Sequence, residues 1–235
     1  MSKIVAIGGG EISELETLAI DKEIVKLTAK DSPQALFIPT ASNDAEGYWE
    51  TFQAVYGERL GCRTDVLYLI KEDLAEKEIK TKILGADLIY VGGGNTKKML
   101  KIWRKLNVDQ YLETALEQGI VLSGLSAGSI CWFKYGHSDS LSFSEQEEWN
   151  YIKVEGLGFI DAFHCPHYDQ SDRAEDFSKM LAESNELGIA IEDRCAIEFV
   201  DGSYRIISAG EEANAYKIYQ KEGELISEVI EKIDD

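Results

Sequence analysis

The chain has 235 residues, of which 44% are hydrophobic and 29% are charged, and its formal net charge is −19. This length and composition exclude a largely disordered chain and predict one soluble globular domain over residues 1–235. Because so acidic a surface repels nucleic acid and anionic lipid, both are excluded as main partners.

The first half of the chain alternates short apolar runs with amphipathic stretches. Such alternation predicts an α/β fold with a mainly parallel, doubly wound sheet and helices on both faces. In sheets of this kind the functional site lies beyond the carboxyl ends of the strands. The predicted strands cover 3–7, 35–39, 65–69, 87–91 and 120–123, and the predicted helices cover 14–30, 46–60, 74–84, 96–105 and 108–118.

The second half is less regular. Residues 136–150 are polar and predict a surface loop, whereas a proline keeps the extended segment at 163–167 out of a helix. A further amphipathic helix is expected over 172–184. Strands are expected at 188–191, 196–200 and 204–207, followed by a terminal strand and a charged tail over 224–235.

The sequence shows no secretory signal and no apolar segment of membrane-spanning length. Its four cysteines are scattered and form no C-x-x-C pair, which is typical of reduced, buried thiols. We therefore expect a cytoplasmic protein with no membrane partner.

A serine motif, Gly124-x-Ser126-x-Gly128, directly follows the strand expected at 120–123. A strand that turns sharply into a helix at such a serine forms a nucleophile elbow, which exposes the hydroxyl. Glycine and serine are also common in ordinary turns, so the spacing alone leaves both interpretations open. Two further glycine corners, 8–10 and 92–95, also end strands, and this shared location favours a nucleophilic Ser126.

A nucleophilic serine needs a base, and histidine is the usual one. His167 follows an apolar extended run at the same sheet edge as Ser126, and His164 faces the opposite side of that run, so one of the two can be the base. His137 lies in the polar loop. A zinc site built from His164, Cys165 and His167 lacks a fourth ligand with motif spacing, so we expect neither a metal nor another cofactor.

A carboxylate should orient the histidine. The candidates near glycines or strand ends are Asp139, Asp169, Glu192 and Asp193, and the last two follow the strand at 188–191.

The oxyanion of an acyl-transfer reaction needs backbone amides as donors. The amide of Ala127, just after the serine at a helix N-terminus, is one candidate, and Gly93 or Gly94 of the 92–94 loop supplies the other. The alternative for this loop, a phosphate cradle, lacks the lysine of a P-loop and the G-x-G-x-x-G spacing.

Four blocks together resemble the dipeptidase E and cyanophycinase family of serine peptidases. They come in the family's order and cover most of residues 1–200; the Gly-Gly-Gly-Asn and Ser-Ala-Gly pair is the most specific. The resemblance implies a fold similar to class I glutamine amidotransferase domains, with a Ser-His-acid triad and no metal. The blocks are Val91-Gly-Gly-Gly-Asn95-Thr96, Gly124-Leu-Ser126-Ala-Gly128, Pro166-His167-Tyr168 and Gly188-Ile-Ala-Ile-Glu-Asp-Arg-Cys-Ala-Ile197.

The resemblance also implies roles for individual residues. Ser126 matches the family nucleophile and His167 the base. An ungapped match puts Asp193 where the family usually has glutamate, whereas Glu192 keeps the residue type one position earlier. Asp193 is preferred and Glu192 stays open as the triad acid.

Three further residues are candidates for substrate binding. Asp139 matches an acid in the loop after the nucleophile, which would suit a substrate's α-ammonium group. Arg173 resembles a basic residue that holds an acidic side chain, and its alternative is a helix-surface arginine. Asn95 ends the Gly-Gly-Gly-Asn motif. Glu11, after the glycines at 8–10, resembles the cyanophycinase members.

The sequence therefore predicts a serine peptidase, a small-substrate exopeptidase or dipeptidase, that acts through an acyl-enzyme as a monomer or homo-oligomer. Peptides beginning with aspartate or β-aspartate are its candidate substrates. The alternatives are a non-peptidase amide hydrolase or amidotransferase-like enzyme on the same fold, a non-catalytic module that binds a nucleotide or small anion, and a degenerate member that keeps only the fold.

Overall fold

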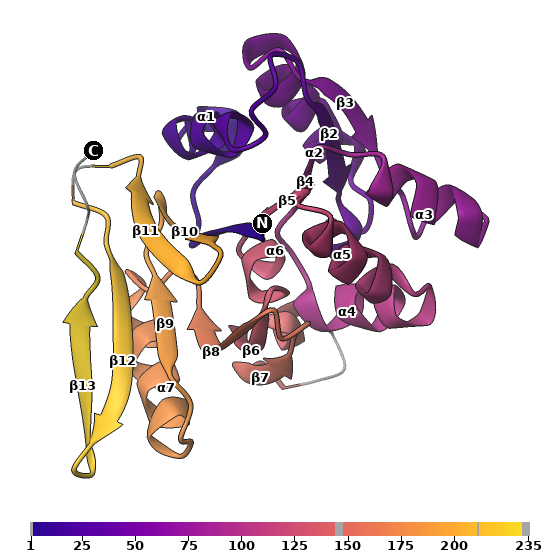
Figure 1. Cartoon of the computed structure of the whole chain (residues 1–235). Coiled ribbons are helices and arrows are strands. Elements are labelled where there is room, and N and C mark those ends of the chain that lie inside the picture. Colours follow the sequence, from indigo (N-terminus) through magenta and orange to yellow (C-terminus); the bar gives the residue numbers. More distant parts are fainter. Residues whose placement is uncertain (1, 144–147, 211, 232–235) are drawn as a thin grey trace.

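The computed structural model describes residues 2–143, 148–210 and 212–231, and these form two β-sheets (Figure 1). The first sheet has seven strands in the order β11-β10-β1-β5-β4-β2-β3. Strands β1 to β5 run parallel to one another, and β10 and β11 extend one edge in antiparallel fashion. The strands span Lys3–Ile7 (β1), Gln34–Ile38 (β2), Arg63–Val66 (β3), Leu88–Val91 (β4), Val121–Leu125 (β5), Cys195–Val200 (β10) and Ser203–Ser208 (β11).

Helices cover both faces of this sheet, which confirms the predicted α/β class. Alternate residues of β1 belong to two separate apolar clusters, as expected for a strand buried on both sides. One face of the sheet packs against α1 (Leu18–Lys26) and α2 (Glu46–Phe52), and the other against α3 (Glu76–Leu84), α4 (Thr96–Lys105) and α5 (Val108–Glu117).

In the described part of the chain, no helix is both long and apolar enough to cross a membrane.

Two predicted helices differ from the sequence pattern in their extent. The helix expected over 14–30 is confined to α1 because Leu15 and Ala29 adopt left-handed backbone conformations, with φ of 63° and 54°. The helix expected over 46–60 continues beyond α2 as a π-helical segment, Gln53–Arg59.

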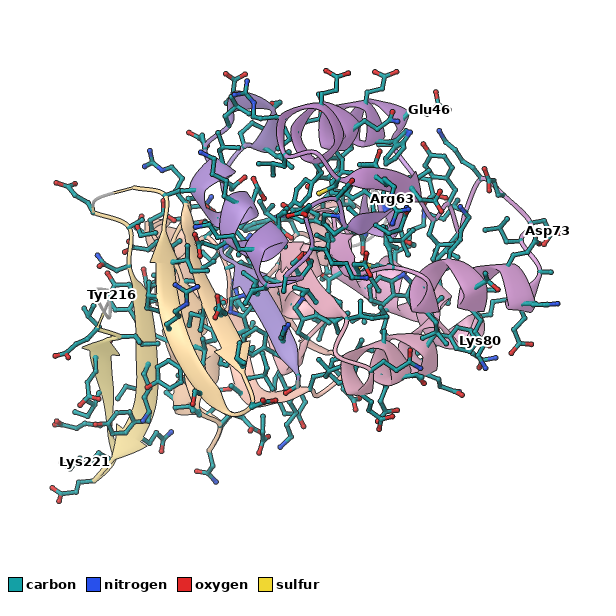
Figure 2. The ribbon with its side chains drawn as sticks, turned by 45° about the horizontal axis from the view of Figure 1, so that its top comes forward. Glu46, Arg63, Asp73, Lys80, Tyr216 and Lys221 are labelled. Atoms are coloured by element: carbon teal, nitrogen blue, oxygen red, sulfur yellow. The ribbon has the colours of Figure 1, made fainter. Side chains whose placement is uncertain are left out.

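A second sheet has six strands in the order β13-β12-β9-β8-β6-β7. Its strands β6, β8 and β9 are parallel, and α7 (Ser171–Ala182) packs on one face. The β12–β13 hairpin forms an outer edge, with Lys221 at its turn (Figure 1, Figure 2). The strands span Phe133–Ser138 (β6), Ile152–Glu155 (β7), Ile160–Cys165 (β8), Gly188–Ile191 (β9), Ala215–Lys221 (β12) and Glu224–Val229 (β13).

The sequence pattern does not predict this second sheet. The surface loop expected over 136–150 is wrong at its start, because residues 136–138 belong to β6. His137 and Ser138 lie in β6 with fully buried side chains that hydrogen-bond to other polar groups, so hydropathy gives no sign of a strand there. Strands β7 and β12 are likewise additions. Residues 144–147 of the expected loop and 232–235 of the expected tail lie outside the described residues.

The two sheets meet at the carboxyl ends of their parallel strands. Just beyond β1, Gly9 forms a parallel bridge with Asp193, which follows β9. The amide of His167, which follows β8, donates to Gly8 O at 3.2 Å. A Cβ on Gly9 would lie 1.8 Å from Asp193 Oδ1 and 2.3 Å from His167 Nδ1, so this contact requires glycine. The segments after β1, β8 and β9 therefore share one site.

Candidate active site

Ser126 occupies a sharp corner between β5 and the short helix α6 (Ala127–Ile130). Its φ of 56° and ψ of −114° are strained for a residue with a side chain, and such strain is concentrated at functional sites. A Cβ on Gly124 would lie 2.2 Å from Gly128 O, and one on Gly128 would lie 2.1 Å from Val91 O. Both glycines of the motif are therefore required by the close approach of strand and helix.

His167 connects Ser126 to Asp193. Its Nε2 lies 2.9 Å from Ser126 Oγ and its Nδ1 lies 2.5 Å from Asp193 Oδ1. A carboxylate that accepts the Nδ1 proton leaves Nε2 unprotonated toward the serine, so that the Ser126 hydroxyl can donate to it. The imidazole is thus held in the tautomer that a general base needs.

The carboxyl of Asp193 is the ionised partner in this chain of hydrogen bonds. Burial alone would raise its pKa, but the hydrogen bond and charge of His167, with smaller contributions from Arg194 and Arg173, outweigh burial and hold the pKa below its ordinary value. Asp169 Oδ1 accepts the Asp193 amide at 3.1 Å and so fixes the backbone that carries this carboxyl.

Glu192, the other candidate acid, is directed away from His167. Its Oε1 accepts the Tyr216 hydroxyl at 2.7 Å, and its Oε2 accepts the Asn214 amide at 2.8 Å. Both partners belong to the segment that includes β12, so Glu192 holds β12 in place and does not contact His167. Adjacent residues of an extended chain point to opposite sides, which separates Glu192 from Asp193.

The other two histidines lie away from the Ser126 hydroxyl. His164 is fully buried between Ile189 O (2.9 Å from Nδ1) and Ser129 Oγ (2.8 Å from Nε2), and burial lowers its pKa to about 3, so it stays neutral. His137 is buried in β6, where its Nε2 lies 2.8 Å from Asp176 Oδ1. Among the described residues, no group of three or more His, Cys, Asp or Glu side chains is arranged to hold a metal ion.

The loop after β4 runs beside the nucleophile. A Cβ on Gly93 would lie 3.5 Å from Ser126 Cβ, and one on Gly94 would lie 2.3 Å from Ala41 O. The Gly93 amide donates to the Tyr48 hydroxyl at 3.4 Å. Because a helix leaves its first amides unpaired, Ala127 has an amide free for a ligand. Sequence reasoning missed Tyr48, which lies in α2 outside any local motif.

The three candidate substrate-binding residues have different environments. Asn95 caps α4, because its Oδ1 accepts the Lys98 amide at 2.9 Å, and its Nδ2 donates to Ser140 O at 3.2 Å. Asp139 and Arg173 form an ion pair of 2.9 Å. The Arg173 side chain is only 4% exposed, so it is not a helix-surface arginine, and its Nε has no hydrogen-bond partner among the described residues.

Comparison with known sequences points to one family. The sequence model of peptidase family S51 matches residues 4–207. An uncharacterized peptidase of Bacillus subtilis strain 168, YgaJ, is 33% identical over 231 residues, which cover 96% of this chain and 95% of the relative. An uncharacterized peptidase of Listeria monocytogenes, Lmo0363, is 30% identical over 151 residues, which cover 63% of this chain and 71% of the relative. These matches confirm the resemblance carried by the glycine and serine motifs.

Two solved structures are similar in fold. A peptidase from an acI-B1 actinobacterium has a TM-score of 0.71 at 20% identity, with 97% of each chain covered. A putative peptidase E from Listeria monocytogenes EGD-e has a TM-score of 0.68 at 21% identity, with 88% of this chain and 98% of the other covered. At these identities the similarity concerns the fold alone, and it supports the mainly parallel α/β class.

Proposed function

Because the chain belongs to peptidase family S51, we propose that it is a serine peptidase in which Ser126, His167 and Asp193 form the catalytic triad. One observation carries this proposal: a continuous run of hydrogen bonds, 2.9 Å from Ser126 Oγ to His167 Nε2 and 2.5 Å from His167 Nδ1 to Asp193 Oδ1. The strained, half-buried corner at Ser126 and its tight glycine neighbours support the same assignment.

In the acylation step, Ser126 Oγ attacks the carbonyl carbon of the scissile amide while His167 Nε2 takes the hydroxyl proton. The negative charge of Asp193 stabilises the imidazolium that forms. The carbonyl oxygen becomes an oxyanion, which the Ala127 amide and the 92–94 loop, through Gly93 or Gly94, would stabilise.

The imidazolium then gives its proton to the leaving amine, the C–N bond breaks and an ester on Ser126 remains. A water molecule attacks this ester while His167 again acts as base. The second tetrahedral intermediate collapses with transfer of the proton back to Ser126 Oγ, and a carboxylic acid product leaves. No redox or metal partner enters the balance.

We propose that the substrate is a small peptide cleaved at its free amino end. Strands β6 and β8 are parallel neighbours with Gly136 opposite His164, so Asp139 and His167, each three residues further on, lie at the same edge of the second sheet. Arg173 is held there by its ion pair with Asp139. A substrate's α-ammonium group would pair with Asp139 and an acidic side chain with Arg173, each in exchange for the present ion pair. Peptides that begin with aspartate or β-aspartate are therefore the first substrates to test.

The test is hydrolysis of a panel of Asp-X, β-Asp-X and other dipeptides by the wild type, Ser126→Ala and a control, Ser32→Ala. Ser32 is exposed and bonds to Gly61 O, far along the chain from the motif. We expect Ser126→Ala to lose at least about 10³-fold in kcat and Ser32→Ala to keep full activity.

Other outcomes of this panel would support the alternative functions. Release of ammonia from side-chain amides, with every dipeptide intact, would favour a non-peptidase amide hydrolase on this fold. Strong thermal stabilisation by a nucleotide, without any hydrolysis, would replace the peptidase proposal with a binding module.

A further inference from the structure

Tyr48 places its hydroxyl against the loop that flanks Ser126. Its oxygen accepts the Gly93 amide at 3.4 Å, and the Cβ position of Gly93 is only 3.5 Å from Ser126 Cβ. Gly93 therefore has Tyr48 and Ser126 among its neighbours. The hydroxyl therefore lies on the loop that is a candidate source of oxyanion donors.

The Tyr48 ring is held firmly in this position. It packs edge-to-face on Phe37, with ring centroids 4.9 Å apart, and a Cβ on Gly92 would lie 2.8 Å from Tyr48 Cε1. The absence of a side chain at Gly92 therefore lets the aromatic ring approach the loop. Because the ring is already fixed on both sides, its hydroxyl loses little conformational entropy when a ligand binds.

The hydroxyl hydrogen of Tyr48 is available for a ligand, as far as the described part of the chain shows. Its oxygen receives the Gly93 amide, and no described residue accepts a hydrogen bond from it. A hydroxyl carries one donor as well as its acceptor lone pairs, so one donor remains for a ligand. Burial, together with the negative charges of Glu11 and Asp21, raises the pKa of Tyr48 to about 12, so this donor persists at neutral pH.

Resting on the proposed function, we infer that Tyr48 is a further catalytic residue whose hydroxyl donates to the oxyanion together with the Ala127 amide. The Gly93 amide then acts through Tyr48: it donates to the hydroxyl oxygen, and the hydroxyl donates to the oxyanion. Hydrogen bonds in such a series polarise and strengthen one another. The donor is more effective in the transition state than in the ground state, because charge develops on the carbonyl oxygen only during attack.

The test compares Tyr48→Phe with a matched control, Tyr90→Phe. Both substitutions remove one hydroxyl from the same aromatic cluster and keep the ring. The Tyr90 hydroxyl is buried and has no hydrogen-bond partner within residues 2–143, 148–210 and 212–231. The measurements are kcat and KM on the dipeptide that the wild type cleaves fastest, and the dissociation constant of phenylboronic acid, which forms a tetrahedral adduct on a serine.

We expect Tyr48→Phe to lower kcat about 100-fold with KM within about twofold, and to weaken phenylboronic acid binding by a similar factor. Tyr90→Phe should leave all three values unchanged. An unchanged or increased kcat in Tyr48→Phe, with an active wild type, would overturn the role of Tyr48 alone. A wild type that hydrolyses no dipeptide and binds no boronate would remove the proposed function and the role of Tyr48 with it.

Discussion

Replacing Asp193 by asparagine separates the two acids that the sequence leaves open. Asparagine keeps the size of the side chain but loses its charge, and its amide nitrogen can donate to His167 Nδ1. The imidazole would then carry its proton on Nε2, facing Ser126, and could no longer accept the hydroxyl proton. The matched control is Glu192→Gln, which removes the neighbouring charge.

The size of the effect follows from the 2.5 Å bond between Asp193 and His167. A charge-assisted bond of this length fixes the tautomer and stabilises the imidazolium. Loss of both roles in a triad reduces kcat by about 10⁴-fold, which is about 5.4 kcal/mol of transition-state stabilisation. Glu192→Gln instead weakens the contacts to Tyr216 and Asn214, so we expect a loss of about 1 kcal/mol in the free energy of unfolding and an unchanged kcat.

The assay is steady-state hydrolysis of the fastest-cleaved dipeptide, with urea unfolding of each variant beside it. Asp193 is not the triad acid if Asp193→Asn keeps kcat within tenfold of the wild type. The same conclusion follows if Glu192→Gln loses activity as strongly as Asp193→Asn while unfolding at the wild-type urea concentration.

Two further predictions concern Gly9, where the two sheets meet, and Asp21, a buried carboxyl of α1. Gly9→Ala should abolish hydrolysis, because its Cβ would separate His167 from Asp193. The control is Gly47→Ala, which has no atom within 4 Å of its Cβ and should keep activity and gain about 0.5 kcal/mol in unfolding free energy. An active Gly9→Ala would contradict the close packing of Gly9 against His167 and Asp193. Burial raises the pKa of Asp21 from 3.8 to about 6, so the folded state binds this proton more tightly than the unfolded state. The unfolding free energy should therefore fall by up to about 3 kcal/mol as the pH rises from about 4 to 6. Urea titrations of Asp21→Asn should lose this dependence on pH, and an Asp21→Asn variant that keeps it would show that Asp21 is not its source.

The sequence predicts β1, β2, β4 and β5 of the first sheet well, because these strands are mainly apolar runs separated by amphipathic helices, and that periodicity is a local signal. The polar strand β3, Arg63–Val66, begins two residues before the strand expected at 65–69. The Ser126 corner is also local: the glycines that the close approach demands lie two residues to either side. Both features follow from short stretches of chain, so neither depends on knowing the rest of the fold.

The features that sequence reasoning misses depend on contacts between distant segments. His137 gives β6 a polar appearance, and its burial is explained by contacts with distant residues, the carboxyl of Asp176 and the ring of Phe177 in α7. The direction of Glu192 depends on β12, which the pattern does not predict. Tyr48 approaches the loop beside Ser126 because Gly92, more than 40 residues later, leaves room for its ring.

Fluorophosphonate labelling followed by peptide mass measurement decides whether Ser126 is the nucleophile. The reagent forms a stable bond to an activated serine oxygen. We predict one adduct per chain, on the peptide that contains Ser126, and its loss in Ser126→Ala and in Asp193→Asn but not in Ser32→Ala. An active enzyme that takes up no label, or that carries the adduct on another residue, would show that Ser126 is not the nucleophile.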